Sequence, residues 1–369
     1  MAIGITTMTG MNYGSALQAY SLQTTFQNFG VDSYTIQLRP RSYLLNFLRK
    51  YFFPNDEWNF RTRMWRFKSD IIYSHKSKLI KKFWDENTFT HYYHSRSHLK
   101  KGEESTKVLL AGSDQIWNPA YIPNYLYYLM FANQNSILYS YAVSLATDVI
   151  NKDAALFYRD RLKSFSGVSV REQTGKVLLS ECIENEIRVD LDPIFLLEKE
   201  YWDSFASDRF KDQKYIFLYV IKPNLELCST IKKIAAQYNL RIYYIGDFSA
   251  KRVGVSDINN ASVEDFLSLI KYASAVVTNS FHATAFSILM NKQFFSYVPP
   301  LSGSRIRDVL DTFDLMGQII DEDSVNESID RYLSGDRGID YSKVNPIIAE
   351  KRVNSLEYLR QIAEVDKCT

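Results

Sequence analysis

The segment Ala275–Asn291 constrains the fold of this chain most, because it predicts a buried strand, a polar turn and an apolar helix in direct succession. Ala275–Thr278 is a short β-branched run, typical of a strand buried in a parallel sheet. Asn279 and Ser280 interrupt the run, and a helical pattern resumes at His282. In parallel α/β sheets, ligands bind at such turns, and a helix start favours anions. The segment therefore predicts a site for an anionic substrate with His282 as proton carrier; a purely structural histidine is the alternative.

Composition narrows the class of protein. The chain has 369 residues, of which 46% are hydrophobic, which is enough for two domains with full cores. A charged fraction of 23% and a net charge of +2 give no indication of nucleic-acid binding. No signal segment is recognisable, and no apolar run approaches the roughly 20 residues of a membrane span. We expect a cytoplasmic protein, with peripheral contact at the inner membrane face as an open alternative.

The first half of the chain predicts a parallel sheet. A strand at Ile3–Thr7, a turn at 10–14, a helix at 16–29 and a strand at 31–37 form a βαβ opening. Strand signals return at 108–112, 136–144, 167–170 and 188–192, so we expect a Rossmann-like domain over 1–200. A basic, aromatic and mostly helical insertion lies near 40–100, with cationic residues at Arg61, Arg63, Arg66, Lys68, Lys76, Lys78, Lys81 and Lys82. Three interpretations of this insertion stay open: a solvated helical face, a lid over the site and a contact with an anionic membrane.

The second half alternates strands and helices regularly. Strands are predicted at 215–221, 241–246, 275–278, 293–298 and 318–321, with helices between them. This alternation predicts a doubly wound Rossmann-like domain over 201–343. Ser262 and Asp265 predict a capping box at one helix start. We expect the C-terminal helix, 344–369, to pack back across the junction and join the first domain.

Polar turns after other strands supply candidate site residues. Asp114 follows the strand at 108–112, and a turn after the first strand occupies the equivalent place. Arg171 and Arg305 carry guanidinium groups that match carboxylate or phosphate geometry. Each segment also has a purely structural alternative. These are a tight turn for the segments of Asn12 and Asp114, a surface ion pair for Arg171 and a flexible loop for Arg305. The full set from these turns is Asn12, Tyr13, Gly14, Ser113, Asp114, Gln115, Arg171 and Arg305.

The sequence does not favour a metal site or a dinucleotide site. His91, His94 and His98 stand at helical spacing, but their neighbours predict extended or loop chain, and no carboxylate or cysteine completes a zinc site. The three cysteines, Cys182, Cys228 and Cys368, are too far apart for a metal motif. The Gly-x-Gly-x-x-Gly fingerprint is absent. We therefore predict no metal and no cofactor.

Taken in order, these segments resemble the polysaccharide pyruvyl transferase family. The specific matches are the runs from Gly112 to Asn118 and from Ser280 to His282. The supporting matches begin at Asn12, Ser169, Asp192, Asn291 and Ser304, and together the matches extend over most of residues 1–320.

The resemblance implies two Rossmann-like domains with parallel sheets that face each other across a cleft, as in GT-B glycosyltransferases. It also implies transfer of a pyruvyl group from phosphoenolpyruvate to a hydroxyl pair of a sugar or lipid-linked saccharide, as part of a bacterial surface-polysaccharide precursor. The product is a cyclic ketal. On this interpretation His282 is the general acid, and Asp114 accepts a proton from the acceptor.

One departure from the family affects the donor site. Many members carry an arginine two residues before the histidine, where this chain has Ser280. We therefore assign the donor's negative charge to Arg171 and Arg305, with Asn279 and Ser280 as further substrate contacts. A GT-B glycosyltransferase that uses a nucleotide sugar, and a non-catalytic sugar-binding protein on the same scaffold, are the alternatives.

Overall fold

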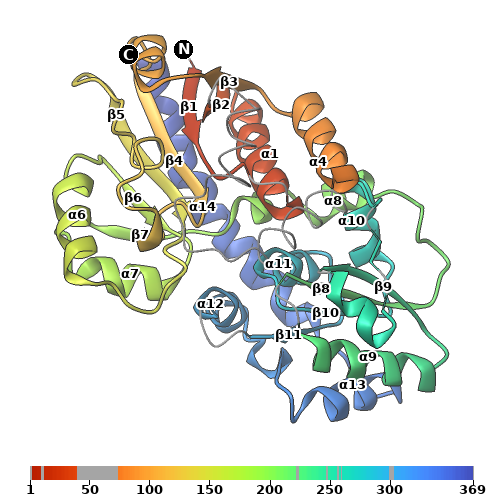
Figure 1. Ribbon diagram of the computed structural model, residues 1–369. Helices are drawn as coiled ribbons and strands as arrows, with labels where there is room; N and C mark the ends of the chain where they lie inside the picture. Colours follow the sequence, from red (N-terminus) through yellow and green to blue (C-terminus); the bar gives the residue numbers. More distant parts are fainter. Residues whose placement is uncertain are drawn as a thin grey trace, which may run out of the picture.

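Two parallel sheets, each flanked by helices, organise the chain in the computed structural model (Figure 1). The structure describes residues 2–9, 12–39, 74–221, 224–246, 248–255, 257–258, 260–298 and 303–368. Arg61, Arg63, Arg66 and Lys68 of the basic insertion lie outside these residues. Within the described ranges, no helix has the length and apolar character needed to cross a membrane.

The first sheet has seven strands in the order β3-β2-β1-β4-β5-β6-β7, and every neighbouring pair is parallel. Its central strand β4 is buried at every position, which explains the uninterrupted apolar run in the sequence. The strands are β1 (Ala2–Thr6), β2 (Asp32–Leu38), β3 (Thr90–Tyr93), β4 (Val108–Asp114), β5 (Ile137–Val143), β6 (Val168–Val170) and β7 (Ile187–Val189). The edge strand β3 comes from the insertion, so its described part is not helical throughout.

The helices of this half are α1 (Tyr13–Asn28), α4 (Ser74–Asn87), α5 (Arg96–Gly102), α6 (Lys152–Leu162), α7 (Gln173–Ser180) and α8 (Lys199–Phe205), with short 3₁₀ turns η1 (Pro119–Tyr121) and η2 (Pro193–Leu196). Helix α1 begins three residues before the expected start at Ala16. The Asn12 side chain accepts a hydrogen bond from Ser15 N at 2.8 Å and so caps the helix. Tyr13 and Gly14, expected in a turn, therefore lie in the first helical turn.

The second sheet has five parallel strands in the order β12-β11-β10-β8-β9. They are β8 (Tyr215–Val220), β9 (Arg241–Gly246), β10 (Ala275–Thr278), β11 (Phe294–Tyr297) and β12 (Ile319–Ile320). The helices are α9 (Leu225–Gln237), α10 (Val263–Lys271), α11 (Phe281–Leu289), α12 (Ser304–Thr312) and α13 (Val325–Leu333), with 3₁₀ turns η3 (Phe248–Val253) and η4 (Met316–Gln318). The capping box of Ser262 and Asp265 is present at α10. This alternation confirms the doubly wound prediction.

An apolar cluster joins the two halves. Tyr13 and Leu17 of α1 belong to the same buried cluster as Phe266 of α10 and Phe286 of α11. The Tyr13 ring stacks on the Phe266 ring, with centroids 4.7 Å apart. Because apolar interfaces resist relative movement, this cluster holds the two sheets in one orientation.

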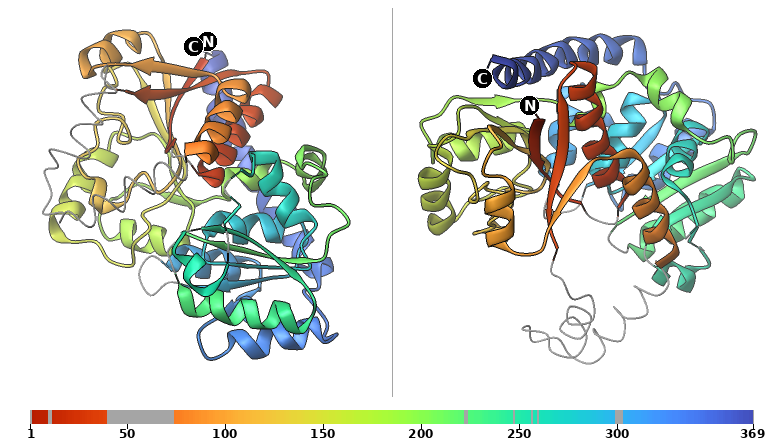
Figure 2. Two further views of the ribbon diagram at one scale, coloured as in Figure 1. Left: turned by 45° about the vertical axis from the view of Figure 1, so that its right-hand side comes forward. Right: turned by 90° about the horizontal axis from the view of Figure 1, so that it is seen from above.

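The long helix α14 (Tyr341–Cys368) connects the halves a second time, as both views in Figure 2 show. Near its start, Ile348 packs in the apolar cluster that includes the second half. Near its end, Leu359 and Ile362 pack against Ile3 and Ile5 of β1. The helix contacts β1, β4 and η2.

Candidate active site

A cavity of about 350 Å³ lies where the carboxyl ends of the two sheets meet. In the first sheet the chain continues from β1 to β2 on one side of β1, while β4 lies on the other side. In the second sheet the chain continues from β8 to β9 on one side of β8, while β10 lies on the other side. Such switch points are where α/β sheets bind ligands. The cavity is lined by Asn12, Gly14, Asp114, Gln115, Asn118, Ala146, Tyr219, Ile221, Asn279, Ser280, Phe281, His282 and Arg305.

His282 lies in the first turn of α11, with a side chain 10% exposed. Ser280 is the N-cap residue of that helix, and its hydroxyl accepts from Ala283 N at 3.5 Å. Gly14 lies against the imidazole: a Cβ at position 14 would lie 2.2 Å from His282 Cγ and Nδ1. Contacts that short do not occur between real atoms, so only glycine allows α1 and α11 to approach this closely.

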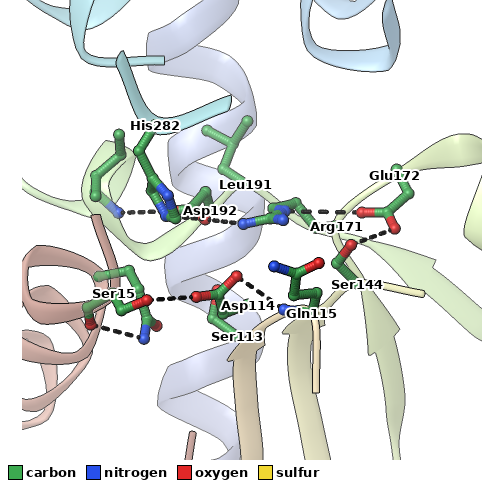
Figure 3. Close-up of polar contacts among 12 residues, drawn as sticks. Ser15, Ser113, Asp114, Gln115, Ser144, Arg171, Glu172, Leu191, Asp192 and His282 are labelled. Carbon is green, nitrogen blue, oxygen red and sulfur yellow. Dashed lines mark hydrogen bonds and ion pairs between the residues drawn. The ribbon is translucent and has the colours of Figure 1, made fainter. Parts of the chain in front are cut away.

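A buried ionic network lies behind the histidine (Figure 3). His282 Nε2 lies 3.6 Å from Asp192 Oδ2, and Arg171 Nη1 donates to the same oxygen at 2.6 Å. Arg171 Nε also lies 3.7 Å from Glu172 Oε2, and its guanidinium lies 3.9 Å from the Phe281 ring centroid. Glu172 Oε1 in turn accepts from Ser144 Oγ at 2.6 Å.

The charged side chains of this network shift one another's pKa values. Burial alone would raise the pKa of Asp192, but His282 and Arg171 lower it to about 2. Burial would lower the pKa of Arg171, yet Asp192, Glu172 and Asp114 raise it above its ordinary value. Burial and the nearby positive charge of Arg171 lower the pKa of Arg305. The network therefore keeps Asp192 ionised, while Arg305 is buried near both the Arg171 cation and the acidic side chains of Asp114 and Glu172.

Asp114 lies at the end of β4 in an unusual backbone conformation. Ser113 and Asp114 have φ angles of 51° and 63°, in the left-handed region that few non-glycine residues adopt. Ser15 Oγ of α1 donates to Asp114 Oδ2 at 2.8 Å, and Gln115 N donates to Oδ1 at 2.8 Å. Strain of this kind persists where the surrounding structure holds it, and it is common at functional sites. Here it turns the carboxylate toward the cavity.

Arg305 lies in the first turn of α12 and reaches the cavity from the second half. Its Nε is buried and has no hydrogen-bond partner. Helix α12 is held against α7, because Thr174 N donates to Asp308 Oδ2 at 2.8 Å. Arg305 therefore presents a guanidinium to the cavity, and its helix α12 is held in place by contacts with both halves of the chain.

Eight of the eleven expected site residues line the cavity: Asn12, Gly14, Asp114, Gln115, Asn279, Ser280, His282 and Arg305. Tyr13 does not, because its side chain turns to the junction and its hydroxyl donates to Ala261 O at 2.9 Å. Ser113 is fully buried in the left-handed end of β4. Arg171 lies behind His282 in the ionic network rather than on the cavity wall.

Sequence reasoning missed several residues that the site depends on. Ser15 orients Asp114, and Asp192 and Glu172 form the network behind the cavity. Asp192 follows a short strand, so its place at the carboxyl end of a parallel strand was the available signal. No cluster of three or more histidine, cysteine, aspartate or glutamate side chains suits a metal ion among the described residues.

Solved structures with similar folds include UDP-N-acetylglucosamine 2-epimerases and a glycosyltransferase. The UDP-N-acetylglucosamine 2-epimerase from Rickettsia bellii has a TM-score of 0.58 at 10% identity, over 97% of this chain and 95% of that one. S. aureus MnaA in a co-structure with UDP has a TM-score of 0.55 at 11% identity, over 98% and 97%. A glycosyltransferase from Rickettsia africae ESF-5 has a TM-score of 0.54 at 12% identity, over 99% and 96%. At such identities the likeness shows the fold, and it confirms the GT-B-like arrangement.

Sequence comparison identifies the family. No curated protein sequence matches the chain significantly. The family model for polysaccharide pyruvyl transferase matches residues 12–299, which include every residue that lines the cavity except Arg305. The match covers most of the chain, and the two sheets and their shared cavity agree with a transferase, so this protein belongs to the polysaccharide pyruvyl transferase family.

Proposed function

We propose that this protein transfers a pyruvyl group from phosphoenolpyruvate to two hydroxyls of a sugar, forming a cyclic ketal on a surface-polysaccharide precursor in the cytoplasm. One observation carries the proposal: within a pyruvyl transferase family member, His282, Asp114 and Arg305 line one cavity of about 350 Å³. An acid, a base and a cation converge there from both halves of the chain. This set matches what ketal formation from an anionic enol donor needs.

The donor carries a phosphate and a carboxylate, and the cavity offers groups for both charges. Arg305 contributes a buried Nε without a protein partner, and a guanidinium bonds well to either anion. The N-terminus of α11 also points toward the cavity through Ser280 and His282. Arg171 adds positive potential from behind, although Asp192 and Glu172 partly neutralise it. We therefore assign the direct donor contact to Arg305 in place of the arginine that Ser280 replaces.

The chemistry begins with proton transfer to the donor. His282 delivers a proton to the methylene carbon, which becomes the methyl group, and the central carbon becomes electrophilic. A first sugar hydroxyl attacks that carbon and gives its proton to Asp114, so the proton that His282 loses equals in number the proton that Asp114 gains. Phosphate then leaves with its bridging oxygen, and the second hydroxyl closes the ketal. The second hydroxyl proton departs with the phosphate, so donor and diol yield ketal and hydrogen phosphate in balance.

Asp114 is placed to accept the proton of an attacking hydroxyl. Its two oxygens each accept one hydrogen bond, from Ser15 Oγ and from Gln115 N, which orients the carboxylate without neutralising it. Carboxylate oxygens accept more than one hydrogen bond each. Asp114 can therefore receive a sugar hydroxyl as a further donor.

The test compares donors and products directly. The purified protein is incubated with phosphoenolpyruvate and diol-bearing sugar acceptors, and ketal product is followed by mass spectrometry alongside released phosphate. Thermal shift with phosphoenolpyruvate is compared with UDP- and GDP-sugars, because a ligand of the native state raises the melting temperature. Stabilisation and turnover with phosphoenolpyruvate support the proposal. Sugar transfer from a nucleotide sugar, the alternative that the glycosyltransferase among the fold neighbours suggests, would replace it.

A further inference from the structure

Asp192 is a buried carboxylate to which the reaction above gives no role. It comes from the turn between β7 and η2, and its side chain has no exposed surface. Its Oδ1 accepts from Ile194 N at 3.2 Å, and its Oδ2 accepts from Arg171 Nη1 at 2.6 Å. The same Oδ2 lies 3.6 Å from His282 Nε2. One backbone N–H and one guanidinium thus hold this carboxylate at the edge of the imidazole.

The imidazole is confined from both sides. Nε2 is buried and has no hydrogen-bond partner, so Asp192 is the acceptor available to it. The opposite edge, with Cγ and Nδ1, lies against Gly14, which itself lines the cavity. The carboxylate therefore occupies the Nε2 edge of the ring, and Nδ1, beside Gly14 in the wall of the cavity, is the nitrogen that the carboxylate leaves free.

Arg171 locks this arrangement. Its guanidinium bonds to Asp192 and stacks on the ring of Phe281, the residue directly before His282. The contacts close a ring of four side chains, so the carboxylate and the histidine cannot move independently. A carboxylate held in this way fixes the tautomer of a histidine, because it accepts from the nitrogen that it faces.

We propose that Asp192 is a positioning residue that holds His282 with Nε2–H toward its carboxylate, so that Nδ1 carries the proton exchanged with the donor. The 3.6 Å separation shortens to a hydrogen bond when the imidazole is charged, as catalytic hydrogen bonds often do in the working complex. This inference rests on the proposed role of His282 as general acid. It goes beyond that role by naming the nitrogen and the residue that selects it.

The experiment reads the tautomer without substrate. The chain has only five histidines, and loss of one signal in His282→Gln assigns its ¹⁵N resonances. In the neutral wild-type ring, we expect the proton on Nε2 and none on Nδ1. In Asp192→Asn, the side-chain amide can donate to Nε2, so the neutral ring should carry its proton on Nδ1. A wild-type ring that keeps the proton on Nδ1 overturns the proposal without any variant.

Kinetics and a matched control complete the test. Asp192→Asn should lower kcat by about 10²–10⁴-fold with donor KM nearly unchanged, since the proton is on the wrong nitrogen. The control is Asp190→Asn: Asp190 is also buried but binds Ser169, Arg188 and Ser355 instead. The control should leave the His282 spectrum and kcat near wild type, and Asp192→Glu should restore the wild-type tautomer. Equal losses in both Asn variants would mean a general effect of buried charge. If the wild type forms no ketal, the proposed reaction fails, while the ¹⁵N spectra still decide the tautomer.

Discussion

At the scale of single residues, the cavity divides its polar groups between the two halves of the chain. Asp114 comes from the first sheet, and His282 and Arg305 come from the second half. His282 and Arg305 can each be replaced, and an exposed residue of the same type serves as control. The proposed roles therefore lead to separable results.

The first prediction concerns His282. His282→Gln should lower ketal formation by about 10²–10⁴-fold, because glutamine cannot deliver the proton at neutral pH. The circular dichroism melting curve should stay close to wild type. The control is His91→Gln, since the His91 side chain is 54% exposed on β3. Equal activity in both variants would remove His282 from the mechanism.

The second prediction separates the two arginines. Arg305→Ala should weaken phosphoenolpyruvate binding by about 1.5–3 kcal/mol, the contribution of a hydrogen bond to a charged group. Arg171→Ala should instead destabilise the fold by about 3–5 kcal/mol, because it leaves Asp192 buried without its partner. Isothermal titration and urea unfolding measure the two effects. Arg307→Ala, an exposed position on the same helix, is the control and should change neither.

The third prediction concerns acid stability. The pKa of Asp192 is lowered to about 2 in the folded state, so the unfolded chain binds this proton first as pH falls. The ion pair therefore stabilises the fold above about pH 4, and that stability is lost as pH falls toward 2. The Asp192→Asn variant lacks this pH-dependent stabilisation. Its deficit in unfolding free energy, measured in urea, should shrink by about 2 kcal/mol between pH 5 and pH 2. A constant deficit across that range would contradict the assignment.

At the scale of elements, the approach of α1 to α11 sets the geometry of the site. The two helix starts meet at Gly14 and His282, where no side chain fits between them. Helix α1 also presents Ser15 to Asp114, so one helical turn positions both proposed proton-transfer groups. A small displacement of α1 should therefore affect catalysis more than stability.

The fourth prediction tests that contact. Gly14→Ala would place a Cβ 2.2 Å from the imidazole, so the ring or the helix must move. We expect kcat to fall by at least about 10-fold, since an ångström-scale misplacement of a catalytic group is costly. Gly317→Ala is the control, because nothing lies within 4 Å of its added Cβ. Unchanged kcat in Gly14→Ala would show that the imidazole is not confined.

At the scale of the whole molecule, we expect the two sheets to unfold as one unit. The apolar cluster at the junction and helix α14 both connect them. Leu359→Ala, at the end of α14 that packs on the first sheet, should cost about 2–5 kcal/mol in unfolding free energy. Val353→Ala on the same helix should cost less than about 0.5 kcal/mol, because Val353 is 65% exposed. Calorimetry should show a single transition for both variants; two separated transitions would mean that the halves unfold independently.

Periodicity predicted most elements, because buried parallel strands are continuous apolar runs and amphipathic helices repeat every 3.6 residues. The strand at 275–278 and the helix start beside it illustrate this: both are local, and both were found. The start of α1 was placed three residues late, because the Asn12 cap depends on one side-chain hydrogen bond. Local signals therefore identify elements better than their ends.

The sequence by itself determined the alternating strands and helices, the family resemblance and most of the residues that line the cavity, because these depend on local pattern and on which turns follow strands. Only the tertiary structure decided which side chains meet there. Arg171 and Asp192 are 21 residues apart, and Asp192 and His282 are farther still, yet they form one buried network. Tyr13 and Gly14 are neighbours that face different surroundings, the junction and the cavity. Contacts between distant segments depend on how the two sheets pack, and local sequence patterns do not specify that packing.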